Sequence, residues 1–300
     1  MLKIAWCSQY VLPLPIGHRF PMSKYEILPL QLIHEGTINE GNLFTPSSLD
    51  ELLILAVHHA TYWNQLSTLT LEPRAVRRTG FPLSQKLVDR ECVIASGTIA
   101  CADYALQFGI AMNIAGGTHH AFTDHGEGFC LLNDIAIAAQ YLLSNAKAKQ
   151  ILIIDLDVHQ GNGTAEIFKY EPRVFTFSMH GANNYPLKKE SSDLDVGLPD
   201  HTSDATYLHT LAFHLDQTMT ALKPDFIFFQ SGVDILDTDQ LGRLKVSREG
   251  CKKRDRMVLQ MARENKIPIV VTMGGGYSKN FIDIIEAHAN TFRVAQEIYF

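Results

Sequence analysis

The stretch that decides the fold is Gln150-Ile-Leu-Ile-Ile-Asp-Leu-Asp-Val-His-Gln-Gly-Asn-Gly-Thr164, in which a short apolar run ends in two carboxylates and an imidazole. Such a run predicts a strand covered on both faces, as in a parallel sheet. Residues two apart in an extended chain share a face, so Asp157 and His159 can point together at one metal ion, with Asp155 one step behind. Ligands gather beyond the carboxyl ends of such strands. Alternatively, these polar residues only cap the turn into a helix.

Further apolar runs alternate with helical patterns along the whole chain. We expect strands at residues 2–6, 111–115, 151–156, 174–178, 226–230 and 269–273. We expect helices at residues 84–108, 131–144, 203–222, 247–264 and 280–297. This alternation predicts an α/β fold, a single open parallel sheet with helices on both faces, in one catalytic domain over residues 1–300. The proline-containing segment 11–46 is expected to be irregular, as functional loops often are.

Composition excludes several classes of protein. The 300 residues carry 26 Lys plus Arg against 32 Asp plus Glu, a net charge of −6, so no global basic field would hold nucleic acid or an anionic membrane. The 5 cysteines are scattered and predict free thiols in a reducing compartment. The apolar start of the chain is too short for a signal peptide, and no stretch is long enough to cross a bilayer. We therefore expect a cytoplasmic protein.

Two local basic clusters stand out within this acidic chain. The first holds Arg74, Arg77 and Arg78, and the second covers residues 252–256 with Arg254 among them. The second cluster falls in a predicted helix and is interpreted as a solvated face. Either cluster could instead guide a charged substrate.

Polar groups follow three other predicted strands. Gly116-Gly-Thr-His-His-Ala121 holds a histidine pair, which suits general acid–base work but equally a structural glycine turn. Ser231-Gly-Val-Asp234 supplies a carboxylate that could also be a helix N-cap. Met273-Gly-Gly-Gly-Tyr277 lets the backbone approach a neighbour closely and brings a phenol. All three segments should meet Asp157 and His159 at one edge of the sheet.

Together, Asp157, His159 and Asp234 offer three metal ligands and leave a fourth position open, as in a catalytic zinc site. Such an ion polarises a carbonyl and acidifies water, while a histidine takes the proton and a tyrosine stabilises the oxyanion. These are the parts of an amide hydrolase. A site of two carboxylates and one imidazole also suits ferrous iron.

Five blocks of the sequence resemble the zinc-dependent histone deacetylases, which have the arginase/deacetylase fold. The blocks are Gly-Gly-Thr-His-His-Ala (116–121), Gly-Glu-Gly-Phe-Cys-Leu-Leu-Asn-Asp (126–134), Asp-Leu-Asp-Val-His-Gln-Gly-Asn-Gly-Thr (155–164), Ser-Gly-Val-Asp-Ile-Leu-Asp-Thr-Asp-Gln-Leu-Gly (231–242) and Gly-Gly-Gly-Tyr (274–277). They run in the family's order. The form of the third and fourth blocks is most similar to class IV and its bacterial relatives.

The resemblance implies a role for each matching residue. Zinc would be held by Asp157, His159 and Asp234. His120 would act as general base, His119 as its electrostatic or acid partner, and Tyr277 as the donor to the amide oxygen. Asp155 would orient His119. Together with Ser178 and Met179, Asp155 also matches the family's inner potassium site. Asn162 stands where many members place a second Asp to orient the base, so His120 should be less basic than in those relatives.

The resemblance also implies the substrate site. Phe129 and Tyr185 would form the walls of an acyl-lysine channel, and Gly128 would lend its carbonyl to the substrate amide. The expected partner is therefore an acyl-lysine protein or peptide, with acyl length and oligomeric state left open. The alternative is a small-molecule deacetylase for acetylated polyamines, with Glu26 and Glu35 as possible acids at the rim.

Two rival functions fit the sequence less well. A binuclear manganese amidinohydrolase would need an Asp two residues after Asp234, and the chain has none there. A silent acyl-lysine reader would not need Tyr277 and both histidines.

Overall fold

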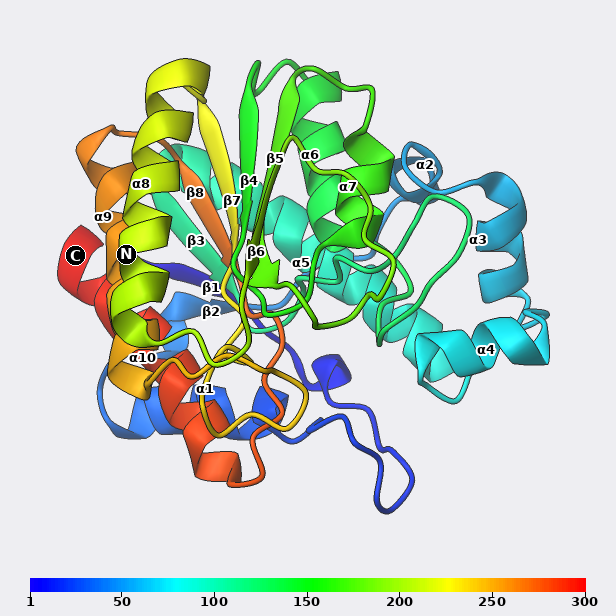
Figure 1. Ribbon diagram of the computed structural model, residues 1–300. Coiled ribbons are helices and arrows are strands. Elements are labelled where there is room, and N and C mark those ends of the chain that lie inside the picture. Colours follow the sequence, from blue (N-terminus) through cyan, green and yellow to red (C-terminus); the bar gives the residue numbers. More distant parts are fainter.

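The computed structural model describes residues 1–300 and contains one eight-stranded sheet in which all neighbouring strands are parallel (Figure 1). The strand order is β2-β1-β3-β8-β7-β4-β5-β6. The strands are β1 (Lys3–Ala5), β2 (Leu43–Phe44), β3 (Ile110–Asn113), β4 (Ile151–Asp155), β5 (Val174–Gly181), β6 (Leu194–Leu198), β7 (Phe226–Gln230) and β8 (Ile269–Thr272). The α/β fold with an open parallel sheet is therefore confirmed.

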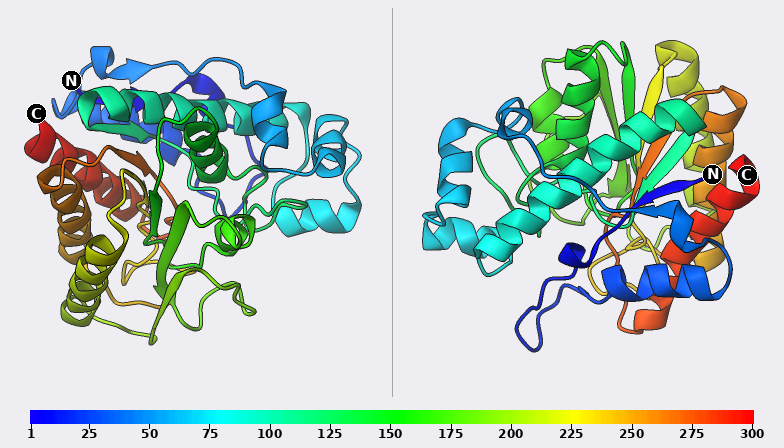
Figure 2. Two further views of the ribbon diagram at one scale, coloured as in Figure 1. Left: turned by 90° about the horizontal axis from the view of Figure 1, so that it is seen from above. Right: turned by 180° about the vertical axis from the view of Figure 1, so that it is seen from behind.

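Helices cover both faces of this sheet (Figure 2). They are α1 (Lys24–His34), α2 (Glu51–Leu55), α3 (Ala60–Ser67), α4 (Pro73–Thr79), α5 (Gln85–Phe108), α6 (Asp134–Ser144), α7 (Asn162–Phe168), α8 (Asp204–Leu222), α9 (Arg248–Glu264) and α10 (Phe281–Tyr299). On one face α5 packs against α6. On the other face α8 packs against α9, α9 against α10, and α10 against α1. The short helices α2, α3 and α4 lie to one side of the sheet (Figure 1). None of the helices combines the length and apolar character needed to cross a bilayer.

Capping residues set where the long helices begin. Ser84 accepts a hydrogen bond from the Leu87 N–H at 3.3 Å and Ser247 from the Gly250 N–H at 3.0 Å, so α5 and α9 start one residue later than predicted. Helix α6 starts at Asp134 and not at the predicted residue 131. Asn133 is its N-cap, because its side chain accepts a hydrogen bond from the Ala136 N–H at 3.0 Å.

The expectation that residues 11–46 are irregular is wrong over α1 and β2. Pro29 lies inside α1 and has no N–H, so it leaves the Tyr25 carbonyl without its helical partner. Nε1 of Trp6 donates to that carbonyl at 2.7 Å, which removes the cost of an unpaired backbone group. The proline is therefore compatible with the helix.

Strand register brings the site together. Asp155 at the end of β4 lies beside Gln230 at the end of β7, and Gln230 lies beside Thr272 at the end of β8. Thr272 in turn pairs with Asn113, the last residue of β3. Because these four strands end at the same level, the loops that follow them start side by side. The polar segments found in the sequence therefore meet at one edge of the sheet.

Candidate active site

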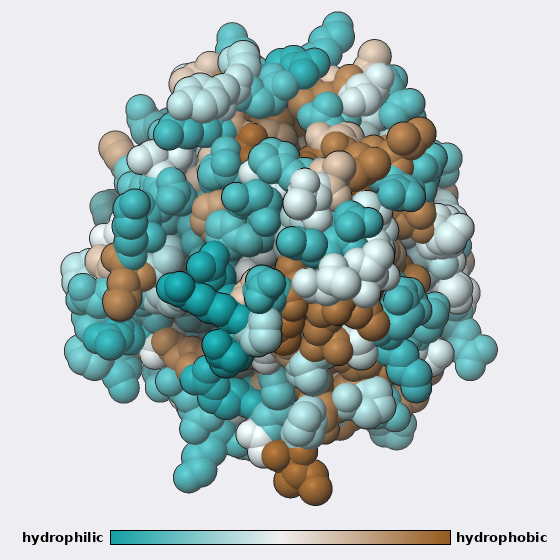
Figure 3. Space-filling model, turned by 90° about the vertical axis from the view of Figure 1, so that its right-hand side faces the viewer, coloured by the Kyte–Doolittle hydropathy of each residue, from teal (hydrophilic) through white to brown (hydrophobic).

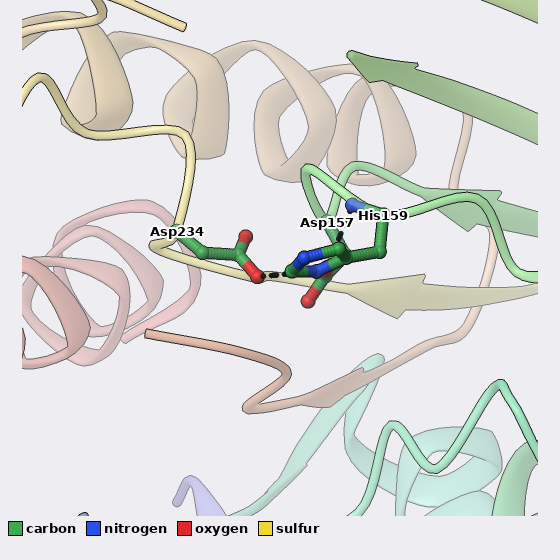
Figure 4. Close-up of side chains that lie close together, drawn as sticks. All are labelled: Asp157, His159 and Asp234. Carbon is green, nitrogen blue, oxygen red and sulfur yellow. Dashed lines mark hydrogen bonds and ion pairs between the residues drawn. The ribbon is translucent and has the colours of Figure 1, made fainter. Parts of the chain in front are cut away.

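Three buried side chains form a group that could hold a metal ion (Figure 4). Asp157 and His159 come from the loop after β4, and Asp234 comes from the loop after β7. Nδ1 of His159 lies 3.0 Å from Oδ1 of Asp157 and 3.2 Å from Oδ2 of Asp234. All three residues are almost fully buried. The structure therefore brings together the three metal ligands expected from the sequence.

The other carboxylate oxygens are held by the backbone. Oδ2 of Asp157 accepts from the Gly275 N–H at 2.8 Å, and Oδ1 of Asp234 accepts from the Val158 N–H at 2.9 Å. A Cβ at Gly275 would lie 2.1 Å from Oδ2 of Asp234, so only glycine fits there. One oxygen of each acid and one imidazole nitrogen remain directed at a common point. Two carboxylates and one imidazole converging in a buried site fit a divalent cation of the zinc type.

The histidine pair lies beside this group, in the loop after β3. The ring centroids of His119 and His120 are 4.1 Å apart. Nδ1 of His119 donates to Oδ2 of Asp155 at 2.7 Å. Burial opposes protonation of His119, but the neighbouring Asp155 outweighs burial, and the pKa of His119 is raised. Both histidines and Asp155 thus take the positions that the sequence predicts.

His120 has a different environment. Its Nδ1 donates to Oδ1 of Asn162 at 2.6 Å, as expected for an amide in place of a second acid. Burial and the two neighbouring histidines hold the pKa of His120 well below its usual range. The orienting amide adds no negative charge to counter them. His120 is therefore a neutral imidazole near pH 7.

Glu127 completes this chain of contacts, and no pattern in the sequence indicates its role. Its Oε1 accepts from Nδ2 of Asn162 at 2.7 Å. Burial raises the pKa of Tyr185, and the neighbouring Glu127 carboxylate raises it further. Glu127 lies in the Gly-Glu-Gly-Phe-Cys block, but no spacing rule relates it to Asn162, which is 35 residues away. Only the folded structure shows the contact.

An outer groove of about 650 Å³ leads to these residues. His120, His159 and Tyr277 lie at its inner end, and Gly128, Phe129 and Tyr185 line its sides. The Tyr185 ring stands edge-on to His120 at 5.0 Å, and the Phe129 ring lies 6.0 Å from Tyr277. The predicted substrate residues therefore line one groove.

The backbone at Gly128 is shaped by the histidine below it. Gly128 has φ +56°, and a Cβ there would lie 2.5 Å from the imidazole of His120. The next residue, Phe129, also has positive φ, at 68°. A non-glycine residue in that region costs about 1–3 kcal/mol, a strain typical of functional sites.

Lys24 is a second residue that the sequence did not indicate. It lies at the start of α1, is fully buried, and donates from Nζ to the Gly274 carbonyl at 3.0 Å. Burial lowers its pKa to about 8. Lysine is rarely buried, and this one lies in the segment expected to be irregular, so no pattern pointed to it.

The interpretation of residues 252–256 as a solvated face is wrong for Arg254. This guanidinium is fully buried and forms an ion pair with Asp255 at 2.7 Å. It donates to the Leu156 carbonyl at 3.1 Å and the Gly232 carbonyl at 2.8 Å. These carbonyls belong to the two loops that carry the metal ligands. Arg254 therefore links the two metal-ligand loops, because it donates a hydrogen bond to a carbonyl of each.

Some expected groupings are absent or incomplete. Glu26 and Glu35 do not line the groove, and Glu35 forms an ion pair with Arg293 elsewhere on the surface. Ser178 lies beside Asp155 in the sheet, with Met179 next to it, but its Oγ is hydrogen-bonded to Nδ1 of His180 at 2.9 Å. A potassium ion at this position stays a prediction.

Comparison with known proteins agrees with this geometry. Residues 18–292 match the family model of the histone deacetylase domain. The chain is 43% identical to an uncharacterised protein of Picosynechococcus sp., over 99% of each chain. It is 31% identical to histone deacetylase 2 of Arabidopsis thaliana, over 89% of this chain and 72% of that protein.

Solved structures show the same fold. A histone deacetylase homologue from Aquifex aeolicus superposes with a TM-score of 0.84 at 23% identity, covering 98% of this chain and 84% of that one. A histone deacetylase homologue in complex with SAHA superposes with a TM-score of 0.85 at 24% identity, covering 99% of this chain and 84% of that one. These structures share the arginase/deacetylase fold of this sheet. The family match over residues 18–292, together with the 31% identity to the Arabidopsis thaliana relative, shows that the chain belongs to the histone deacetylase family.

Proposed function

We propose that this protein is a zinc-dependent amide hydrolase that removes acyl groups from lysine side chains of proteins or peptides. The observation that carries the proposal is the convergence of Asp157, His159 and Asp234, of which His159 lines the same groove as His120 and Tyr277. When bound there, zinc would supply a Lewis acid that polarises the amide carbonyl and acidifies a water molecule.

The side chains around the metal ligands would transfer protons and stabilise the developing oxyanion. His120 donates through Nδ1 to Asn162, so its Nε2 is free to take a proton from the attacking water. His119, held by Asp155, adds positive character next to the reacting amide and can return a proton to the leaving amine. Tyr277 would donate its hydroxyl hydrogen to the amide oxygen as negative charge develops there.

The groove would hold the substrate in line with these groups. Phe129 and Tyr185 offer aromatic surfaces to the lysine stem, and the Gly128 carbonyl would accept a hydrogen bond from the substrate amide N–H. The resemblance to class IV sequences favours acyl chains longer than acetyl.

A potassium ion bound near Asp155, Ser178 and Met179 would be structural, because it would lie behind His119 and not in the groove.

The test uses purified enzyme with zinc and a set of peptides whose lysine carries acyl chains from acetyl to myristoyl, together with acetylated polyamines. We expect about one zinc per chain, deacylation of the peptides, and inhibition by a hydroxamate chelator. The variant Asp234→Asn should lose zinc and activity together. Two equivalents of manganese with turnover of guanidino compounds would contradict the proposal. A higher kcat/KM on acetylated polyamines than on every peptide would establish the small-molecule alternative instead.

A further inference from the structure

The mouth of the groove is strongly basic although the chain is acidic. Four arginines line it, Arg19, Arg77, Arg78 and Arg243, and no Asp or Glu does. The whole chain has a net charge of −6. We call these four residues the arginine rim. The chain has 32 acidic residues and 26 Lys plus Arg, so a random selection of its charged residues would place more acids than bases at the mouth.

The four guanidinium groups are mostly unpaired. All four residues are exposed. Arg243 lies 3.4 Å from the Asp200 carboxylate, whereas Arg19, Arg77 and Arg78 have no carboxylate within ion-pair distance. Grouping like charges without counter-ions gives the fold no stability. The stability of the fold therefore does not explain why these arginines cluster.

Each segment that carries a rim arginine is tied to the catalytic groove. The end of α4 receives hydrogen bonds from the Gly128 N–H to the Arg78 carbonyl, at 3.1 Å, and from the Phe129 N–H to the Thr79 carbonyl, at 2.8 Å. Arg77 and Arg78 are therefore fixed to the loop that forms one side of the groove. Figure 3 shows the face on which α3 and α4 lie, with strongly hydrophilic side chains bordering an apolar area.

The other two segments are anchored in a similar way. His18 packs flat against Phe81 at 5.6 Å and is hydrogen-bonded through Nε2 to the Gly80 carbonyl at 2.8 Å, which holds Arg19 beside α4. On the opposite side, Nδ2 of Asn184 donates to the Leu241 carbonyl at 2.7 Å, which links the Arg243 loop to the Tyr185 loop. The backbone segments that carry the arginine rim are thus held around the groove entrance.

We propose that the arginine rim selects substrates in which carboxylates flank the acyl-lysine, that is, acidic peptide segments, and disfavours cationic ones. This inference rests on the proposed deacylase function and specifies its substrate class. Guanidinium groups recognise carboxylates through paired hydrogen bonds, and a basic entrance raises the local concentration of anionic substrates. Acetylated polyamines and lysine-rich tails carry positive charge at the same positions and would be repelled. Nucleic acid is a weaker candidate, because the chain as a whole carries a net charge of −6.

The experiment compares three acyl-lysine peptides that differ only in the flanking residues, which are aspartates, asparagines or lysines. At low ionic strength kcat/KM should be about tenfold or more higher for the acidic than for the basic peptide. In about 0.5 M salt the ratio should shrink severalfold, because such ionic strength screens exposed charges. Equal values for the three peptides would overturn the inference while leaving the deacylase function intact. No hydrolysis of any peptide would instead overturn the proposed function.

Variants test which residues are responsible. Arg77→Glu combined with Arg78→Glu should reverse the preference, so that the basic peptide becomes the better substrate. Arg243→Gln should reduce the ratio by a smaller factor, because Arg243 already has Asp200 as a partner. The matched control is Arg74→Glu, an exposed position on the same helix that does not line the groove, and its ratio should equal that of the wild type. A ratio that changes equally in the Arg74 variant, or inhibition by a short oligonucleotide stronger than by an acidic peptide, would contradict a substrate-selecting rim.

Discussion

The Glu127 carboxylate accepts a hydrogen bond from Nδ2 of Asn162 at 2.7 Å, and this contact sets the orientation of the Asn162 amide. With Nδ2 engaged, Oδ1 is the atom that faces His120, and it accepts from Nδ1 of the imidazole at 2.6 Å. A neutral imidazole that donates through Nδ1 keeps Nε2 as an acceptor. Glu127 therefore selects the His120 tautomer without touching the histidine.

Replacing Glu127 with Ala should lower kcat about 10- to 100-fold and leave KM nearly unchanged, the usual range for removing a supporting hydrogen bond. The physical reason is that the Asn162 amide can then rotate and present Nδ2, which cannot accept from Nδ1 of His120. Glu127→Gln should keep more activity, because its Oε1 can accept the same hydrogen bond. Steady-state kinetics on one acyl-lysine peptide measures all three proteins.

Asp124 provides the control for this prediction. It is an exposed carboxylate in the same loop and is hydrogen-bonded to His125 at 2.6 Å. Asp124→Ala should retain the kcat of the wild type. Equal losses in the Asp124 and Glu127 variants would show that the loop, and not the contact with Asn162, matters.

Tyr277→Phe should reduce kcat by about 10²–10³ while KM changes little, because the lost hydrogen bond forms mainly in the transition state. The phenol lies within the groove beside His159, at 6.4 Å between ring centroids, and its backbone N–H is held by Asp239 at 2.6 Å, so the ring should keep its place without the hydroxyl. Tyr170→Phe, at a surface position that is 88% exposed, is the control. Normal turnover by Tyr277→Phe would remove this hydroxyl from the mechanism.

The strand ends of the site were predictable from the sequence because each apolar run is soon followed by a polar side chain. The parallel sheet brings the loop after β4, which carries Asp157 and His159, and the loop after β7, which carries Asp234, to the same edge. The register that aligns Asp155 with Gln230 completes the site. Strand prediction was therefore enough to place these residues at one edge, whereas the orientation of Asp157 and His159 is set by the loop after β4 and not by a strand period.

Lys24, Glu127 and Arg254 were not predictable in the same way. Each is a charged residue whose partners lie far away in the sequence, such as the Gly274 carbonyl for Lys24. Charged residues are normally exposed, so a local pattern favours the surface for all three. The basic run around Arg254 looked like a solvated helix face, and only the packing of α9 against the sheet shows that one member points inward.

Arg254→Met should destabilise the protein by about 3–5 kcal/mol, because it leaves the buried Asp255 carboxylate without its partner. The Leu156 and Gly232 carbonyls would lose their donor as well. Since these carbonyls lie in the metal-ligand loops, zinc affinity should fall in parallel. Urea unfolding with and without zinc measures both effects.

Arg256→Met is the matched control, two positions along the same helix. Arg256 forms an exposed ion pair with Glu297, and such pairs are worth about 0–1 kcal/mol. Its unfolding midpoint should shift little, and zinc binding should not change. A similar small shift for Arg254→Met would mean that the buried ion pair does not stabilise the fold.

Acid should destabilise the fold through His58. This residue is buried, its Nδ1 donates to the Phe122 carbonyl at 2.9 Å, and its Nε2 accepts from the Asn133 N–H at 3.0 Å, so both contacts require the neutral ring. Burial lowers its pKa from 6.5 to about 4. Between these values the unfolded chain takes up a proton and the folded chain does not, so stability falls as the pH drops from 6.5 towards 4. From pH 7 to pH 5 this amounts to about 2 kcal/mol.

The variant His58→Gln isolates this contribution, because an amide can donate to the Phe122 carbonyl and accept from the Asn133 N–H without titrating. Its free energy of unfolding, measured in urea at pH 7 and pH 5, should fall by about 2 kcal/mol less than that of the wild type over the same interval. His209→Gln, at an exposed position on α8, should follow the wild type. Other acid-sensitive groups, including the metal ligands, are common to all three proteins and cancel in the comparison. If His58→Gln lost as much stability as the wild type between the two pH values, His58 would not be held neutral by its surroundings.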